Sequence, residues 1–121
     1  FDVYGHLDYV VRYCPSGEKI FRMADYNDVL EQIFKIIIPK RKGIEINTGS
    51  LYKNMSYAHP HMDILKLYKD MGGEIITVGS DAHKPEYLCY DFETYARDAL
   101  TSLGYRYYCT FKNRKPEFNP L

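Results

Sequence analysis

The sequence has few cysteines, no excess of either charge and no long apolar segment, and each shortage excludes a class of protein. Its three cysteines, Cys14, Cys89 and Cys109, are an odd number at long spacings, so they predict neither a disulfide framework nor a zinc knuckle. This pattern favours a reducing, cytoplasmic setting. The longest strongly apolar run, residues 36–38, is far too short to cross a bilayer and no signal peptide is visible, so we expect no membrane association.

Charge is balanced as well, with 16 lysines and arginines against 16 aspartates and glutamates. This balance argues against a nucleic-acid partner, although Lys112, Arg114 and Lys115 leave a local basic patch open. The hydrophobic content and the 13 tyrosines are those of a folded chain rather than a disordered one. A length of 121 residues suffices for a single domain over residues 1–121.

The hydrophobic pattern predicts alternating strands and helices. Residues 24–38, for example, place apolar side chains at spacings of three and four, which is typical of an amphipathic helix. In chain order we expect a strand within 1–11, a helix at 24–38, a strand at 43–48, a helix at 62–71, a strand at 75–78, a helix from 85 to about 103, a strand at 105–111 and a basic, proline-containing tail at 112–121. This order predicts an α/β fold of parallel strands with right-handed crossovers and the helices outside.

The clearest candidate site follows the strand at 75–78, where Asp81 and His83 lie two positions apart. In an extended segment such residues point the same way. A carboxylate beside an imidazole suits Zn, Mn or Fe, and sites form at the C-terminal ends of parallel strands. The alternative is an ordinary hydrogen-bonded pair on a loop.

Two earlier strands also end in polar side chains. His6 follows Gly5, which would let the chain turn sharply so that His6 points inward, and Glu45 and Asn47 share one face of their strand. Three successive strands with polar groups at the same end predict a barrel-type active site. For His6 a capping or core-edge role is the alternative.

One further pair of histidines, His59 and His61, has the same spacing of two positions. It precedes a helix rather than following a strand. We therefore expect solvent or capping roles for both side chains rather than metal binding.

Several segments taken together resemble a known family. Residues 5–8 (Gly-His-Leu-Asp), 43–48 (Gly-Ile-Glu-Ile-Asn-Thr) and 79–86 (Gly-Ser-Asp-Ala-His-Lys-Pro-Glu) resemble, in that order, the last motifs of the PHP (polymerase and histidinol phosphatase) superfamily. Residues 64–73 and 111–116 resemble its histidinol-phosphatase branch. The similarity covers nearly the whole chain, and Ser-Asp-Ala-His joined to Gly-His-Leu-Asp upstream is a fairly specific combination.

The family's opening motifs, a His-x-His pair, further histidines and a bridging carboxylate, have no match in this sequence. The chain begins at Phe1 and is already strand-like by Val3, so we expect that a segment upstream has been removed. The resemblance thus identifies residues 1–121 as the C-terminal part of a PHP domain. It implies about half of a distorted (β/α)7 TIM-like barrel that, when complete, holds up to three divalent metal ions (Zn, Mn or Fe) and hydrolyses histidinol phosphate in histidine biosynthesis.

Position by position, the resemblance implies roles for seven residues. His6, Asp81 and His83 match metal ligands, and Arg12 matches a position that holds the substrate phosphate. The family usually carries an arginine near position 52, where this sequence has Tyr52 followed by Lys53, so phosphate binding there would depend on Lys53. Glu45 and Asn47 would orient ligands rather than coordinate metal.

Two other functions remain open. The chain could be a noncatalytic half-barrel whose open strand edges pair with another copy, as a homodimer, or with the missing N-terminal half. It could also be a relative of PHP nucleases, which the neutral charge and the phosphatase-like C-terminal segment disfavour. Three ligands cannot hold three metals with normal coordination, so we expect little or no activity from the chain alone.

Overall fold

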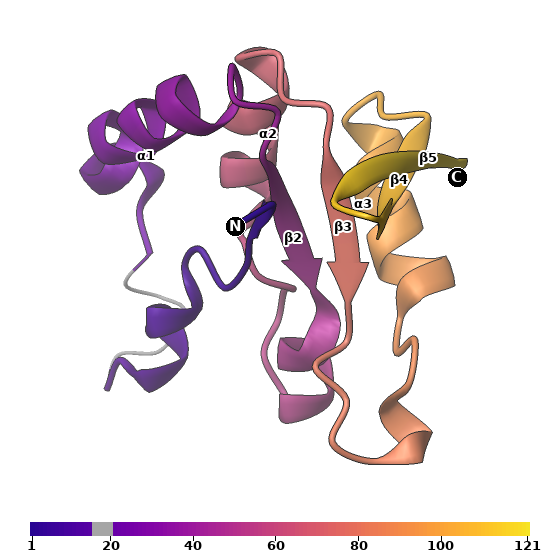
Figure 1. Cartoon of the computed structure of the whole chain (residues 1–121). Coiled ribbons are helices and arrows are strands. Elements are labelled where there is room, and N and C mark those ends of the chain that lie inside the picture. The colour runs from indigo at the N-terminus through magenta and orange to yellow at the C-terminus, as the bar shows by residue number, and fades with distance from the viewer. Residues whose placement is uncertain (16–20) are drawn as a thin grey trace.

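The computed structural model describes residues 1–15 and 21–121. Their elements are β1 (Val3–Tyr4), the 3-10 helix η1 (Tyr9–Tyr13), α1 (Met23–Ile37), β2 (Gly43–Asn47), the 3-10 helix η3 (Thr48–Lys53), α2 (Met62–Asp70), β3 (Ile76–Gly79), the 3-10 helix η4 (Pro85–Tyr87), the π-helical turn η5 (Phe92–Ala96), α3 (Arg97–Ser102), β4 (Tyr107–Lys112) and β5 (Lys115–Pro120). Figure 1 shows η3 beyond the arrowhead of β2, with η1 to its left and η4 below β3. No helix in this described part has the length and apolarity that crossing a membrane requires.

A parallel sheet in the order β1-β2-β3 forms the centre of the fold. Its register places Ile44 beside Ile76 and Glu45 beside Thr77. Because side chains alternate along a strand, the isoleucines share one face and Glu45 and Thr77 the other. Ile44, Ile46 and Ile76 are fully buried, whereas Glu45 and Thr77 are only half-buried. The predicted α/β fold with parallel strands is confirmed.

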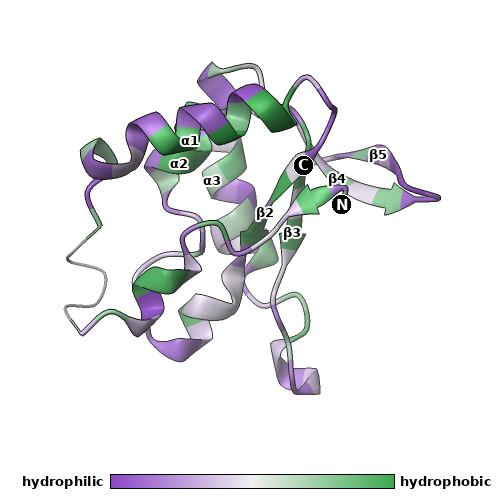
Figure 2. Cartoon of the chain, turned by 60° about the vertical axis from the view of Figure 1, so that its left-hand side comes forward, coloured by the Kyte–Doolittle hydropathy of each residue, from purple (hydrophilic) through white to green (hydrophobic). Residues whose placement is uncertain are grey.

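The helices α1 and α2 cover the isoleucine face of this sheet. Leu30, Phe34 and Ile37 of α1 are buried as the spacing predicts, and the Phe34 ring meets the Tyr68 ring of α2 edge to face at 5.1 Å between centroids. Figure 2 shows hydrophobic residues along β2 and β3, and hydrophilic residues alternating with hydrophobic ones along α1. Burial of these apolar side chains is the main source of stability.

The segment predicted as one helix from 85 to about 103 is interrupted. Cys89 and Asp91 adopt left-handed φ angles of 54° and 51°, which separate η4 from the helical turns of η5 and α3. The buried Thr48 hydroxyl donates to the Tyr90 carbonyl at 2.7 Å and so binds the irregular segment to the start of η3. This tertiary contact outweighs the helical pattern.

The strand predicted at 105–111 is present as β4, but it does not join the parallel sheet, and the predicted tail contains a further strand, β5. β4 and β5 form a separate antiparallel hairpin, joined by Asn113 and Arg114 at left-handed φ angles of 51° and 63°. Arg114 then reaches back to Asp2, with Nε 3.1 Å from Oδ2, and this guanidinium lowers the pKa of the Asp2 carboxyl. The candidate basic patch therefore has one of its cations paired.

Candidate functional site

The chain turns immediately after β1 and after β3, and both turns carry a predicted site residue. His6 and Asp81 adopt left-handed φ angles of 57° and 50°, each two residues beyond its strand. The turn predicted for Gly5 thus lies at His6 itself. Gly5 has another use, since a Cβ atom there would come within 3.0 Å of Glu45 Oε2. The end of the sheet is therefore shaped to accept the Glu45 carboxylate.

Asn47 joins the first part of the site. Its Nδ2 lies 3.2 Å from His6 Nε2 and 3.4 Å from Glu45 Oε2, while its Oδ1 accepts a hydrogen bond from the Gly49 amide at 2.9 Å. An amide nitrogen only donates, so His6 Nε2 is the acceptor in this contact. Asn47 is buried, and its three contacts fix its orientation. Glu45 and Asn47 thus stand where residues that orient His6 would stand.

Asp81 is the centre of the second part. Its Oδ1 lies 3.6 Å from His83 Nε2, its Oδ2 lies 3.3 Å from Lys53 Nζ, and its carbonyl accepts a hydrogen bond from the Tyr52 hydroxyl at 2.6 Å. The His83 side chain is 81% exposed, so its ring is open to ligands from solvent. Asp81 and His83 are in contact, although Asp81 adopts a left-handed turn rather than the extended conformation expected. Lys53, expected to bind phosphate, contacts the Asp81 carboxylate instead.

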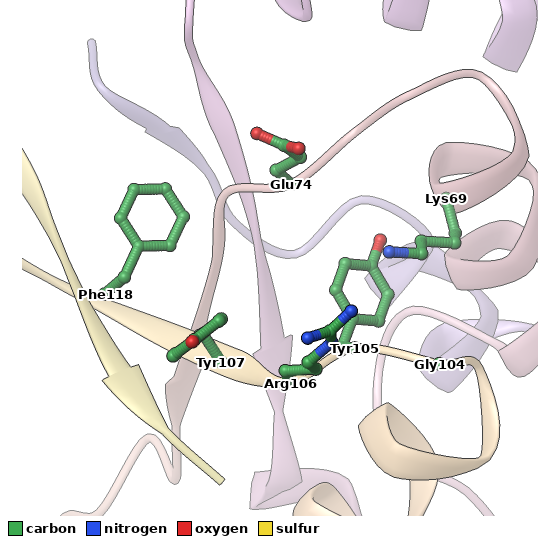
Figure 3. Close-up of a pocket in the computed structure, with 7 residues that line it drawn as sticks. All are labelled: Lys69, Glu74, Gly104, Tyr105, Arg106, Tyr107 and Phe118. Atoms are coloured by element: carbon green, nitrogen blue, oxygen red, sulfur yellow. The ribbon is translucent and has the colours of Figure 1, made fainter.

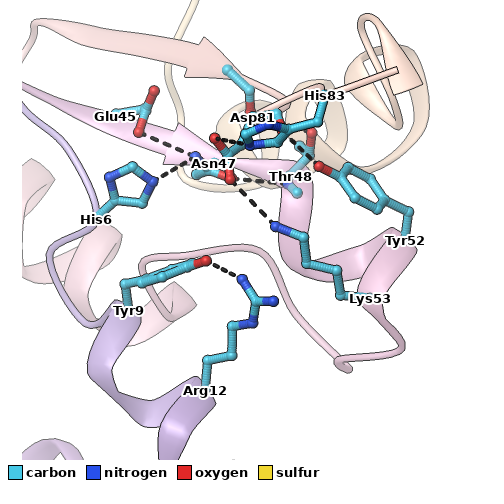
Figure 4. Close-up of polar contacts among 12 residues, drawn as sticks. His6, Tyr9, Arg12, Glu45, Asn47, Thr48, Tyr52, Lys53, Asp81 and His83 are labelled. Atoms are coloured by element: carbon cyan, nitrogen blue, oxygen red, sulfur yellow. Dashed lines mark hydrogen bonds and ion pairs between the residues drawn. The ribbon is translucent and has the colours of Figure 1, made fainter. Parts of the chain in front are cut away.

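Tyr9 connects His6 with Arg12. The Arg12 guanidinium donates to the Tyr9 hydroxyl and lies 5.3 Å from the centroid of the Tyr9 ring and 5.5 Å from that of Tyr13. The His6 ring meets the Tyr9 ring edge to face at 4.8 Å between centroids. Figure 4 shows Arg12 and Lys53 approaching the same cluster from η1 and η3.

The residues present fit a metal ion only in part. Their chemistry is suitable, since an aspartate oxygen and two imidazoles are ligands that Zn, Mn and Fe accept. Among the described residues, however, no group of three or more His, Cys, Asp or Glu side chains is close enough to hold an ion. Asp81 and His83 make a pair, whereas the His6 nitrogen faces Asn47. A complete site would need ligands from outside these residues.

The solvent or capping role predicted for His59 and His61 is present in only one of them. His61 caps α2, with Nδ1 accepting the Asp63 amide at 3.2 Å, and its predicted capping role is confirmed. His59 is 0% exposed, and its Nδ1 lies 2.8 Å from Asp8 Oδ1, so the solvent or capping role predicted for it is wrong. Nothing in the sequence spacing signals this contact, because 51 positions separate the two residues. The contacts of Tyr9 with the His6 ring and with Arg12 were also not predicted.

A cavity lies apart from the candidate site, near the start of β3. Figure 3 shows Lys69, Glu74 and Arg106 around this hollow of about 380 Å³, whose remaining lining residues are Gly104, Tyr105, Tyr107 and Phe118. Glu74 and Arg106 are exposed, and the Lys69 ammonium lies 4.2 Å from the centroid of the Tyr105 ring. None of the predicted site residues lines this cavity. The polar groups at the strand ends remain the candidate site.

Comparison with known proteins relates the chain to phosphatases. The particular relatives are histidinol-phosphatases. The chain is 32% identical over 121 residues to the histidinol-phosphatase of Lactococcus lactis, a match that covers 98% of this chain and 44% of that protein. It is 33% identical over 107 residues to a probable histidinol-phosphatase of Thermotoga maritima, covering 88% of this chain and 43% of the relative. No family model matches the chain.

A solved structure agrees with the sequence matches. It is the crystal structure of histidinol phosphate phosphatase from Lactococcus lactis in complex with zinc, L-histidinol and phosphate. The TM-score is 0.71 and the sequence identity 28%, over 97% of this chain and 44% of the solved one. The chain therefore spans less than half the length of these relatives.

Proposed function

We propose that this chain is the C-terminal part of a metal-dependent phosphatase of the PHP superfamily that acts on histidinol phosphate. The observation that carries the proposal is that His6, Asn47 and Asp81 stand at the carboxyl ends of three adjacent parallel strands, with the His6 ring in contact with Asn47. The names of the relatives, and the zinc, histidinol and phosphate of the solved relative, support the choice of metal and substrate. Free cysteines in the described residues fit a cytoplasmic location.

The fold proposed for the whole domain is a distorted (β/α)7 barrel, of which this chain supplies about half. Parallel sheets are usually covered on both faces, but here the Glu45 and Thr77 side chains are only half-buried. Among the described residues, β1 pairs only with β2. An apolar hollow of about 330 Å³ lies beside this edge, lined by Phe1, Tyr4, Ile33, Ile36 and Ile37. Further strands and helices of the barrel would cover this region.

In this proposal His6, Asp81 and His83 hold divalent ions together with ligands from the remainder of the domain. Bound ions would lower the pKa of a coordinated water and neutralise charge on the phosphoryl oxygens. The carboxylate of Asp81 now serves Lys53 and His83. Coordination of an ion by Asp81 would compete with the contact to Lys53, whose ammonium would then be available to the substrate phosphate.

Arg12 is the second proposed phosphate contact. Its guanidinium is permanently charged and can present two parallel N–H donors to phosphate oxygens. Contacts with Tyr9 and Tyr13 restrict its position, and Tyr9 also touches the His6 ring. Arg12 would therefore place the phosphate at a fixed position relative to the ion on His6.

Zinc titration by calorimetry tests the metal site, with phosphate release from histidinol phosphate as the second measurement. We expect weak zinc binding by the chain, little hydrolysis because the ligand set is incomplete, and at least about a tenfold loss of zinc affinity in Asp81→Asn and His83→Gln. Asp70→Asn is the matched control, because the exposed Asp70 carboxylate pairs with Lys66 on α2 and is not among the proposed ligands. Unchanged zinc binding in both site variants would contradict the proposed ligands, and rapid turnover by the 121-residue chain would contradict the incomplete site.

A noncatalytic assembly module is the second candidate, favoured by the same open edge of β1 and its apolar surroundings. Exposed strand edges pair readily with other chains. Light scattering distinguishes the cases, because a homodimer supports the module and a compact monomer argues against it.

A further inference from the structure

His59 is held by its backbone to the strand end that carries Asn47. The backbone N–H of Asn47 donates to the backbone carbonyl of His59 at 2.6 Å, and the backbone N–H of His59 donates to the backbone carbonyl of Asn47 at 3.0 Å. These two bonds form an isolated antiparallel bridge. The position of His59 is therefore tied to the residue whose side chain contacts His6.

The His59 side chain contacts Asp8, which follows His6 in the sequence. Its Nδ1 lies 2.8 Å from Asp8 Oδ1, and Asp8 Oδ2 accepts the His61 amide at 2.8 Å. Asp8 is two positions after His6 and is 6% exposed, while His59 is 0% exposed. A carboxylate oxygen accepts, so Nδ1 is the donor in this pair. The pair thus fixes the turn that carries His6.

A third contact runs through Tyr9. Its ring lies 5.5 Å from the His59 ring and 4.8 Å from the His6 ring, measured between centroids. The remaining ring nitrogen of His59, Nε2, is buried and has no hydrogen-bond partner among the described residues. An apolar side chain would avoid the unpaired Nε2, but it would also remove the donor to the buried Asp8 Oδ1. Packing alone therefore does not explain an imidazole at this position.

We infer that His59 is a positioning residue, which acts through Asp8 and Asn47 to hold the His6 ring where it can bind a cation. The cation-binding part of this inference rests on the proposed function. The geometric part does not, since it concerns contacts of the metal-free chain.

The test compares His59→Asn with His59→Gln. An asparagine amide can donate from nearly the position of Nδ1, whereas the longer glutamine side chain moves its amide away from Asp8. We expect the NMR contact between the His6 ring and the Asn47 side-chain amide to persist in His59→Asn and to be lost in His59→Gln. Zinc titration followed on the His6 ring signals should show at least about a tenfold loss of affinity in His59→Gln and near-normal affinity in His59→Asn.

Leu100→Ala is the stability control, because Leu100 is fully buried in α3 and is not among the site residues. It should lower the melting temperature without altering the His6 signals. If His59→Gln fails to fold, Asp8→Asn replaces it, since its NH2 group would place a donor against either His59 Nδ1 or the His61 amide. Unchanged His6 contacts in the folded variant would overturn the inference. Absence of zinc binding by the unmodified chain would instead overturn the proposed function, while the metal-free contact still decides the role of His59.

Discussion

The Nε2 atom of His6 lies 3.2 Å from the Nδ2 atom of Asn47, although 41 positions separate the two residues. The contact follows from the parallel pairing of β1 with β2, which brings the carboxyl ends of both strands to one edge of the sheet. The same Asn47 side chain accepts the Gly49 amide at the start of η3. One buried amide thus connects a proposed ligand with the helix that carries Lys53.

Replacing Asn47 by alanine should remove both its contact with His6 and its cap on η3. Loss of the cap on η3 should lower the free energy of unfolding by about 0.5–2 kcal/mol, and the His6 ring should lose its fixed orientation. Urea unfolding and the NMR signals of His6 measure the two effects. Asn119→Ala is the matched control, because that asparagine donates to Thr110 on the β4–β5 hairpin. A variant as stable as the unmodified chain, with unchanged His6 signals, would contradict this account.

Two glycines in the sheet should respond differently to the same substitution. A Cβ at Gly43 would lie 2.5 Å from the Ile75 carbonyl oxygen, a backbone atom that cannot move without disturbing the sheet. Gly43→Ala should therefore cost about 1–3 kcal/mol or more. A Cβ at Gly79 would lie 2.6 Å from Glu45 Oε1, which is the end of a flexible side chain. Gly79→Ala should mainly displace Glu45 and cost less than Gly43→Ala.

A double-mutant cycle in urea checks the second half of this prediction. If Glu45 relieves the clash by moving, Glu45→Ala should remove most of the cost of Gly79→Ala. Additive effects of the two substitutions would show that the clash involves something other than Glu45.

The sequence was sufficient to predict the arrangement of the strand ends. Alternation along β2 assigns Ile44 and Ile46 to the core and Glu45 and Asn47 to the other face, and parallel pairing then brings the polar groups together. The contact of His59 with Asp8 could not be predicted in this way. It joins two loops that have no periodic pattern, and only the folded backbone determines their distance.

The hairpin was missed for a related reason. Pro116 and Pro120 make residues 115–120 look unlike a strand, yet β5 is an edge strand, where a missing amide proton is tolerated. Between residues 85 and 103, the helical pattern is correct for Ala96, Ala99 and Leu100, which are all buried. The break before them depends on the contact of Thr48 with Tyr90, which local sequence does not contain.

Alkaline pH should weaken the fold through Tyr68. Burial raises the pKa of its hydroxyl from 10.0 to about 12. A raised pKa in the folded state means that the stabilisation is complete below pH 10.0 and is lost as the pH rises through about 12. Burial also raises the pKa of Tyr105, which adds to the effect in the same direction. The melting temperature, followed by circular dichroism, should therefore fall above pH 10.0.

Tyr68→Phe tests the origin of this dependence. At neutral pH it should cost about 1 kcal/mol, because the hydroxyl donates to the Ile75 carbonyl at 3.2 Å. Above pH 10.0 the variant should lose stability less steeply than the unmodified chain. Tyr107→Phe is the control, since Tyr107 is 46% exposed. Equal slopes for the unmodified chain and Tyr68→Phe would assign the alkaline transition to other groups.

If the chain is the assembly module of the second candidate, the apolar region beside β1 should cause it to self-associate. Ile36 is 57% exposed and lines the hollow with Tyr4 and Ile37, so a partner segment that covers it would gain hydrophobic free energy. Ile36→Lys should weaken association by at least about tenfold, since half-burying an isoleucine is worth about 1 kcal/mol and a charge there adds a desolvation cost. Its effect on the melting temperature of the monomer should be small.

Sedimentation velocity over a range of concentrations measures this association. Leu88→Lys is the matched control, because Leu88 is 68% exposed but lies at the end of η4, outside the hollow. If both substitutions weaken association equally, general hydrophobicity rather than the β1 edge is responsible. If the unmodified chain stays monomeric at every concentration, the exposed region does not suffice for pairing between copies. Covering it would then require a segment whose shape is complementary to it, as the half-barrel proposal supposes.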